Sequence, residues 1–529
     1  MSGDTSNAAP AFAAGLAGKC AESLERQECA VTGAVPAWLS GSTLLRNGPG
    51  TFDIELAGGR GTFTVPHWFD GLTQLHAWEF DQGKVFYRSR HLYPALEKHV
   101  SSTRRYSGFD CPAGSSVLGM LGRRLLQALR LVAPGKPADP TSRLNVGVTI
   151  GPIAQDLYSK TDANVLTPID QATLAPRPQT TYTDMNPAFK GPFSAAHGQR
   201  DEARKTYYNY TLDIPGQSHP CRRRTYHVFA IPDDQPTGRL LASIRATPAY
   251  VHSFAQTENY IILCVWPLLY DLPRLAVFGA PAPAMRWSPE RPALWHVIDK
   301  GGKGHVATYR SDAFYCFHTI NAFEAEGGLA VDLCGYDDAS WLHTFRLPHL
   351  RSGKAKPPAV DIRRYTLPDL AGAIAVGPRT VHAATCTTIA SSGGSSKGGC
   401  RAYELPRINK AVANKRYQFA YAAAVADEDS GFFDAIAKVD VQSGVTRLWR
   451  LPGHFPGEPI FVARPGGTGE DDGLLLTVVL AGPDKHSYLL VLDARSMKEV
   501  ARAAVPHVVG FGFHGNLFGS ASGESTDLA

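Results

Sequence analysis

The sequence lacks any run of about 18 uninterrupted apolar residues, the length expected of a transmembrane helix, which argues against a membrane-spanning segment. Its nine cysteines form no C-x-x-C pair and are odd in number. This usage argues against a disulfide framework and favours a reducing compartment, so we expect a cytosolic protein. Charged residues make up only 19% of the chain and nearly balance, with a net charge of +5, which argues against a nucleic-acid partner.

Long helical patterns are nearly absent as well. Most of the chain has the pattern of short strands rich in Val, Leu, Tyr and Thr, bounded by turn residues, with 51 glycines and 38 prolines overall. We therefore predict an all-β protein, built as a sandwich pair, a large barrel or a propeller. No fixed-period repeat supports a WD40 or kelch array. The clearest predicted strands are "GKVFYRSRHL", "KTYYNYTLDI", "RTYHVFAI", "GLLLTVVLAG" and "HSYLLVLDA".

The domain organisation is predicted to be simple. Hydrophobic residues amount to 44% of the chain, enough for one large core over residues 31–520. Residues 1–30 lack the basic start of a secretory signal and are predicted to be a poorly ordered lead-in. Residues 521–529 are predicted to be a flexible tail.

One segment departs from the all-β pattern. In residues 117–133, "VLGMLGRRLLQALRLVA", apolar side chains fall on one helical face and Arg123, Gln127 and Arg130 on the other. The pattern predicts an amphipathic helix, within an insertion at about 110–135, that either packs on the protein body or lies in a membrane interface. Cys111, just upstream, is a candidate for palmitoylation.

Four of the 18 histidines share a context of short apolar or small-residue strands beside Gly, Thr or Ser: His197, His252, His318 and His514. A lone histidine in such a strand is more often a hydrogen-bonded core residue. Burying four neutral imidazoles would need four separate hydrogen-bonding solutions, whereas one shared metal explains them together. Their wide separation excludes a zinc finger or H-E-x-x-H helix and requires a closed architecture. Histidines beside turns or charges are predicted at the surface, among them His67, His91 and His99.

A series of motifs extends these contexts from about Leu44 to Phe518. In order they are "LLRNGPGTFD", "HWFDGLTQLHAWEF", "KTDANVL", "AAHGQRD", "PAYVHSFAQTENYIILCVWP", "FHTINAFE", "GEPIFVARP", "EDDGLLLTVVL" and "FHGNLF". Together they resemble the carotenoid cleavage oxygenase family, especially its β-carotene- and torulene-cleaving, retinal-forming members and the related retinoid isomerase.

The resemblance implies a seven-bladed β-propeller with a helical and loop cap over a substrate tunnel. It also implies one Fe(II) per chain on the propeller axis, held by the four histidines named above. The positions that orient these ligands in the family match Asp162, Glu404 and Glu458. Asp162 is one methylene shorter than the glutamate usual in the animal enzymes, so its reach to a histidine is the least direct. Without the resemblance, both glutamates would be interpreted as solvated loop residues.

The implied reaction uses dioxygen as co-substrate, bound beside Thr161, to cleave a conjugated double bond of a carotenoid into two aldehydes such as retinal. Imidazole ligands suit Fe(II), and four neutral ones leave it open positions without an added co-substrate. Tyr250 is predicted to stabilise a transient polyene cation through its ring face. Phe254 and Phe317 are further candidates; Tyr250 could equally be propeller core, and for the two phenylalanines the core explanation is favoured.

Because a carotenoid is insoluble in water, the resemblance favours the interfacial interpretation of residues 117–133. It thus predicts a cytoplasmic enzyme attached peripherally to a membrane. Three alternatives remain on the same scaffold: an isomerase that uses iron as a Lewis acid on a retinyl ester, a stilbene-cleaving oxygenase, and a carotenoid-binding propeller without catalysis. The oligomeric state is not predicted.

Overall fold

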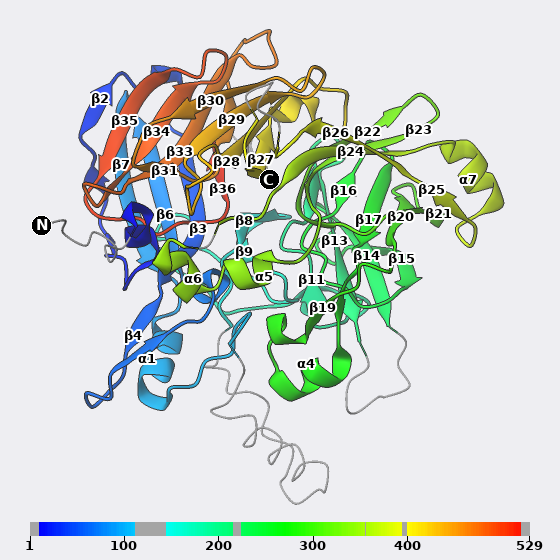
Figure 1. The fold of residues 1–529 in the computed structure, drawn as a ribbon, viewed down its shortest axis with the longest axis horizontal. Coiled ribbons are helices and arrows are strands. Elements are labelled where there is room, and N and C mark those ends of the chain that lie inside the picture. The colour runs from blue at the N-terminus through cyan, green and yellow to red at the C-terminus, as the bar shows by residue number, and fades with distance from the viewer. Residues whose placement is uncertain (1–9, 112–143, 215–223, 355, 394–398, 520–529) are drawn as a thin grey trace, which may run out of the picture.

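The computed structural model describes residues 10–111, 144–214, 224–354, 356–393 and 399–519. In this part of the chain, seven sheets of three or more strands, antiparallel except for one edge strand, surround one centre (Figure 1). They form a seven-bladed β-propeller, which confirms the predicted fold class. Two further strand pairs, β4 (Asp53–Glu55) with β5 (Thr62–Thr64) and β18 (Leu268–Tyr270) with β19 (Met285–Trp287), lie outside the blades.

The blades follow the chain in order. The first contains β1 (Gln27–Glu28), β3 (Thr43–Thr51), β6 (Leu72–Asp81), β7 (Lys84–His91) and β36 (Gly515–Phe518). The second contains β8 (Thr149–Ile153), β9 (Asp156–Lys160) and β10 (Thr167–Pro168). The third contains β11 (Phe193–Ser194), β12 (Gln199–Asp201), β13 (Thr206–Asp213), β14 (Thr225–Pro232) and β15 (Arg239–Arg245). The fourth contains β16 (Ala255–Gln256), β17 (Tyr260–Val265), β20 (Ala293–Asp299), β21 (Gly304–Ser311) and the parallel β25 (Val381–Ala383).

The remaining three blades complete the ring. The fifth contains β22 (Tyr315–Ala325), β23 (Gly328–Tyr336), β24 (Asp361–Leu367) and β26 (Thr385–Ala390). The sixth contains β27 (Ala402–Ile408), β28 (Phe419–Val425), β29 (Ala435–Asp440) and β30 (Thr446–Arg450). The seventh contains β31 (His454–Pro456), β32 (Ile460–Ala463), β33 (Gly473–Ala481), β34 (His486–Asp493), β35 (Glu499–Val505) and β2 (Val31–Gly33).

The five strands picked out from the sequence are all present, as β7, β13, β14, β33 and β34. Between β33 and β34 the turn "GPDK" reverses the chain, and Lys485 adopts the left-handed backbone conformation (φ 48°) that such a turn needs. All nine residues of β33 are buried, because each blade packs against a neighbour on both of its faces. This packing explains why β33 reads as a continuous apolar run and not as an alternating one.

Both ends of the chain take part in closing the ring. The N-terminal β2 pairs with β35 in the last blade, and the C-terminal β36 pairs with β3 in the first. In Figure 1 the blue and red strands of these blades accordingly lie side by side. Closure of this kind satisfies the strand edges that an open sheet would expose.

The N-terminal boundary differs from the prediction of a lead-in over residues 1–30. Phe12 and Leu16, in the 3₁₀ helix Ala11–Leu16, are buried in the main core, and Gln27 pairs with Tyr87 of β7. The ordered domain therefore begins before residue 31, since apolar residues of the Ala-rich stretch have a packing partner in the propeller. Residues 1–9 and 520–529 lie outside the described residues.

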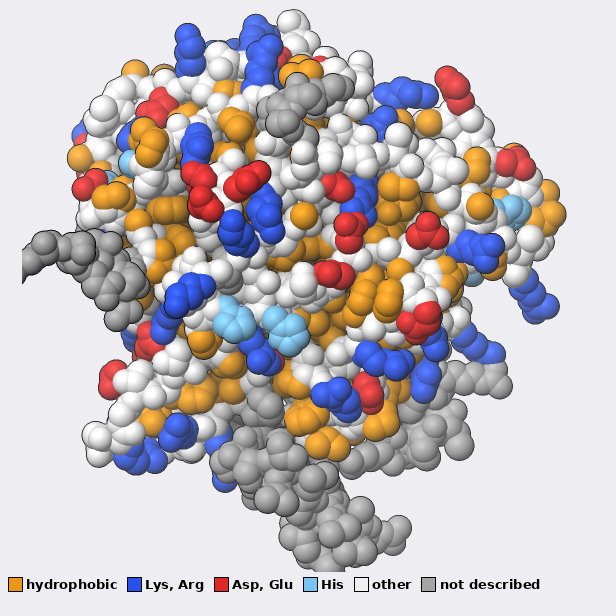
Figure 2. All heavy atoms as spheres, in the orientation of Figure 1, with side chains coloured by type: hydrophobic (Ala, Val, Ile, Leu, Met, Phe, Trp, Pro, Cys, Tyr) orange, Lys and Arg blue, Asp and Glu red, His pale blue; other side chains and the backbone are white. Residues whose placement is uncertain are grey.

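Short helices lie against the propeller. They are α1 (Pro94–Thr103), α4 (Leu272–Phe278), α5 (Trp341–Thr344) and α6 (Leu347–Ser352); α3 (Tyr182–Met185) and α7 (Leu370–Val376) lie elsewhere. In Figure 1, α1 and α4 lie below the sheets, and α5 and α6 lie near the middle of the view. No helix among the described residues is long and apolar enough to cross a bilayer. On the face drawn in Figure 2, basic and acidic side chains are interspersed.

Candidate metal centre

Four blades each deliver one histidine to the centre of the propeller. His197 lies between β11 and β12, His252 precedes β16, His318 lies within β22, and His514 directly precedes β36. Each ring offers one nitrogen to the cluster, and these four nitrogens all lie within 4.8 Å of one another. The structure therefore brings together all four predicted histidines from segments far apart in the sequence.

Their spacing suits a single ion. Imidazoles bound to one metal at about 2.1 Å have nitrogens roughly 3.0 Å apart at adjacent positions and roughly 4.2 Å apart at opposite ones. The Nε2 atoms of His318 and His514 are 3.1 Å apart. In the same buried cluster, Nε2 of His197 has no hydrogen-bond partner. A cation between these nitrogens would satisfy all of them at once.

Three carboxylates fix the orientation of three of these rings. Asp162 lies 2.8 Å from Nδ1 of His252, Glu404 contacts Nδ1 of His318, and Glu458 lies 2.7 Å from Nδ1 of His514. Each Nδ1–H donates to its carboxylate, which leaves the Nε2 lone pair for a metal. The lone pairs of His318 and His514 then face each other across 3.1 Å, a repulsive arrangement unless a cation lies between them.

The four histidines and the three carboxylates come from seven different blades. The third, fourth, fifth and first blades supply the histidines, and the second, sixth and seventh supply Asp162, Glu404 and Glu458. Each of the seven blades therefore contributes one group to the centre. The short Asp162 reaches His252 directly, so no water or backbone shift is needed to span the missing methylene.

A further layer of side chains holds the carboxylates in place. The Tyr250 hydroxyl donates to Asp162 at 3.0 Å, the Tyr336 hydroxyl donates to Glu404 at 2.7 Å, and Arg407 Nε donates to Glu458 at 2.8 Å. Tyr336 and Arg407 were not among the predicted site residues. Neither residue lies in a motif that pointed to the site, and a sequence carries no information on these hydrogen bonds.

These contacts keep the centre ready for a cation. Burial acts to raise the pKa of Glu404 and of Glu458, but their hydrogen-bond and charge partners outweigh it and hold both pKa values below the usual range. Burial and the neighbouring imidazoles hold the pKa of His197 well below its ordinary value, and burial lowers that of His514 to about 3. Two neutral imidazoles beside ionised carboxylates form a donor set that fits a divalent metal.

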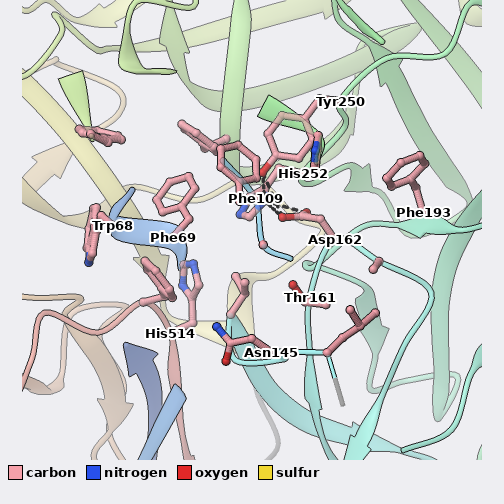
Figure 3. A pocket seen from close by; sticks show the side chains of 18 of the residues that line it. Trp68, Phe69, Phe109, Asn145, Thr161, Asp162, Phe193, Tyr250, His252 and His514 are labelled. Carbon is pink, nitrogen blue, oxygen red and sulfur yellow. Dashed lines mark hydrogen bonds and ion pairs between the residues drawn. The ribbon is translucent and has the colours of Figure 1, made fainter. Parts of the chain in front are cut away.

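An apolar cavity of about 260 Å³ adjoins the centre and reaches His252, His318 and His514. Figure 3 shows its aromatic walls around the Tyr250, His252 and Asp162 group. The main aromatic side chains that line it are Trp68, Phe69, Phe109, Tyr250, Phe317 and Phe513. The cavity thus offers ring faces and very few polar groups to a bound molecule.

The other predicted residues divide between the cavity and the core. Thr161 and Phe317 line the cavity, and the ring centroid of Phe317 lies 5.3 Å from that of His252. Phe254 is buried and packs against Tyr210 outside the cavity walls, so the core explanation holds for it. Tyr250 lines the cavity with its ring and hydrogen-bonds Asp162 with its hydroxyl.

A loop at the cavity wall is anchored to a buried acid. The Asp70 carboxylate accepts hydrogen bonds from the backbone N–H groups of Phe109 and Asp110, at 2.5 and 3.1 Å. Burial raises the pKa of Asp70 to about 7.

His67, predicted at the surface, is fully buried beside Phe69 and Phe109, and burial lowers its pKa to about 3. That prediction was wrong because the cap covers the turn in which His67 lies, and His91 is buried as well, under the N-terminal segment.

The predicted amphipathic helix over residues 117–133 lies outside the described residues. Cys111, at the edge of that segment, is partly buried, and burial raises the pKa of its thiol to about 12. The described cysteines are all free thiols, which agrees with the absence of a disulfide framework from the sequence pattern.

Comparison with known proteins identifies relatives of this chain. A family model described as "Retinal pigment epithelial membrane protein" matches residues 18–518. A torulene dioxygenase of Fusarium fujikuroi is 31% identical, over 91% of this chain and 89% of the relative. A β,β-carotene 15,15'-dioxygenase of Mus musculus is 30% identical, over 93% of this chain and 89% of the relative. A variant of the Synechocystis apocarotenoid oxygenase shares the fold, with a TM-score of 0.74 at 22% identity over 96% of this chain and 98% of that one. Since the family model spans nearly the entire propeller and the relatives match along almost their full lengths, the chain belongs to the retinal pigment epithelial membrane protein family of carotenoid oxygenases.

Proposed function

We propose that the chain is a metal-dependent dioxygenase that cleaves one conjugated double bond of a carotenoid. The observation that carries the proposal is the four-histidine cluster at the wall of an aromatic cavity. Two relatives are named as dioxygenases of torulene and of β-carotene, and these names support the same substrate class. The finer proposal is one Fe(II) per chain, β-carotene or a torulene-like substrate, and retinal as a product.

Fe(II) bound by four neutral imidazoles would keep its full charge and open positions, and would supply the redox chemistry that activates dioxygen. In the overall reaction the C=C bond breaks and the two atoms of one dioxygen molecule become the oxygens of two aldehydes. No other oxidant or reductant is needed. This balance is what separates the proposal from an isomerase, which would consume no dioxygen.

The chain's own residues act on the polyene and on the ligands. Phe69, Phe109 and Phe317 offer ring faces to a hydrocarbon and exclude water from the cavity. Tyr250 faces the same space, where its ring can stabilise positive charge that develops on the polyene. Thr161 lies at the cavity wall next to Asp162, so it would border dioxygen as well as substrate.

An isotope experiment tests the reaction. Purified protein is incubated with β-carotene, torulene and retinyl ester under ¹⁸O₂, and the products are analysed by mass spectrometry. We expect two labelled aldehydes from a carotenoid and no isomerised retinoid. Unlabelled aldehydes, or no aldehydes, would refute the dioxygenase proposal and favour an isomerase or a non-catalytic carotenoid-binding propeller. Cleavage of a phenolic stilbene but of no carotenoid would favour a stilbene-cleaving oxygenase.

A matched pair of variants tests the metal site. His252→Ala removes one of the four clustered nitrogens, whereas His99→Ala changes an exposed histidine on α1. We expect His252→Ala to purify with little iron and without turnover, and His99→Ala to match the unaltered protein in both. Iron content and turnover retained by His252→Ala would refute the assignment.

Membrane attachment and location are further parts of the proposal. The amphipathic pattern of residues 117–133 and the poor water solubility of a carotenoid support a cytoplasmic enzyme that meets a membrane peripherally. Cell fractionation with and without high salt would test both.

A further inference from the structure

The two sides of the four-histidine cluster have different surroundings. The apolar cavity lies on one side, and a second cavity of about 120 Å³ reaches His197, His318 and His514. His318 and His514 border both cavities, so the cluster separates them. We call the second one the polar cavity, because Gln199, Thr319 and other polar side chains form much of its wall.

The polar cavity continues toward the surface. Its outer wall contains Arg200, Lys410, Ala413 and Asn414, and these four residues also border a surface hollow of about 640 Å³. None of the four lines the apolar cavity. The turn at 200–204 and the segment 410–415 therefore form the boundary between the polar cavity, which reaches the cluster, and the surface hollow.

Hydrogen bonds fix the walls of the polar cavity. Gln199 Nε2 and the Thr319 hydroxyl both donate to the carbonyl oxygen of Phe254, at 2.8 and 3.1 Å. Asn321 Nδ2 donates to the carbonyl oxygen of Lys415 at 3.0 Å. A polar cavity needs only about 10–15 Å³ to hold one water, so this cavity has room for several. The polar cavity is therefore part of the folded structure and is large enough for hydrated contents.

We propose that the polar cavity is the route by which a divalent cation enters and leaves the four-histidine site. The inference rests on the metal site of the proposed function. An ion loses its hydration at great cost in apolar surroundings, which makes the aromatic cavity an unsuitable path. The polar cavity offers water, amide and hydroxyl oxygens in place of that hydration. Carotenoid and dioxygen are both apolar and belong to the other side, so metal exchange does not depend on substrate traffic.

The charges at the neck regulate the rate of passage. Both guanidinium arms of Arg200 are paired with Asp233, at 2.6 and 2.7 Å. Lys410 lies where the polar cavity meets the surface hollow, and the acidic Glu202 and Glu258 also border that hollow. A positive charge at this place repels an approaching dication and slows its entry, more strongly at low ionic strength.

Two alanines in one short segment give a matched test. Ala413 borders both the polar cavity and the surface hollow, whereas Ala411 borders the hollow only. The full-length apoprotein is given Co(II), and uptake is followed by visible absorbance; release from the iron-loaded protein is followed with a chelator. Because a tryptophan at 413 adds bulk where the polar cavity and the surface hollow meet, we expect Ala413→Trp to slow both rates about tenfold or more. The final metal content should not change, and Ala411→Trp should match the unaltered protein.

A charge reversal provides a second variant that leaves the passage open. Lys410→Glu changes the local charge by two units, and we expect Co(II) uptake about fivefold faster at low salt, with the gain lost near 1 M salt. Unchanged rates in both Ala413→Trp and Lys410→Glu, with one equivalent of metal bound, would overturn the route alone. Slower exchange when a carotenoid product fills the apolar cavity would also overturn it. Failure of the unaltered chain to bind any metal would overturn the proposed metal site together with the route.

Discussion

Tyr250→Phe separates the two roles that the structure gives to this residue. The change keeps the ring that lines the cavity and removes the hydroxyl that donates to Asp162 at 3.0 Å, close to Nδ1 of His252. Burial and the adjacent Asp162 keep the pKa of Tyr250 well above its ordinary value, so the hydroxyl is a constant donor. A buried hydrogen bond to a charged acceptor contributes about 1.5–3 kcal/mol. If that energy goes into orienting His252, metal affinity should fall roughly 10- to 100-fold.

The assay is competition for Co(II) between the protein and a chelator of known affinity, alongside kcat and KM for a carotenoid. Tyr315→Phe is the control, because Tyr315 stacks on Tyr250 at 6.1 Å and its buried hydroxyl has no hydrogen-bond partner. We expect the control to bind metal normally. Unaltered metal affinity in Tyr250→Phe would refute the reasoning, and a fall in kcat alone would assign the hydroxyl to the polyene instead.

Three further predictions concern other parts of the chain. Glu404→Gln should weaken metal binding about 10- to 100-fold in the same competition assay, since it replaces a carboxylate that orients His318, whereas Glu326→Gln, at an exposed turn, should have no effect. Asp70 has a pKa of about 7 in the folded chain and about 3.9 when unfolded, so the folded chain binds the extra proton between those values. The contribution of Asp70 to stability therefore falls as pH rises from 4 to 7, and the slope of Tm against pH over that range should be smaller in Asp70→Asn. Deletion of residues 117–133 should reduce binding to liposomes in a flotation assay; full retention would mean that the segment does not mediate membrane contact.

The strands of the propeller were predictable because their signals are local. The β33–β34 hairpin carries two apolar runs and a turn between them, all within one stretch of sequence. The number of blades depends on contacts between distant segments, so no local signal reveals it. Without the family resemblance, the strand pattern was compatible with a sandwich pair, a barrel or a propeller. The buried N-terminal segment was missed for a related reason: its Phe12 finds its packing partners, Phe432 and Phe455, only in the folded ring.

The sequence context of the four histidines made them predictable as ligands, but their positions relative to one another could not be predicted from it. His318 and His514 are 196 positions apart, and no periodicity connects them. Tyr336 and Arg407 went unnoticed because a tyrosine on a buried strand and an arginine after a proline look ordinary until the carboxylate beside each is known. His67 was misplaced because its burial depends on a cap contributed by distant segments.

The pairing of β36 with β3 sets an order of events during synthesis. His514 directly precedes β36, so the fourth nitrogen reaches the centre only when the last strand docks into the first blade. A nascent chain that still holds residues 514–518 in the exit tunnel can place the other three histidines but not this one. A metal ion therefore meets a complete site only after β36 has docked, and a chain terminated before His514 has no such site.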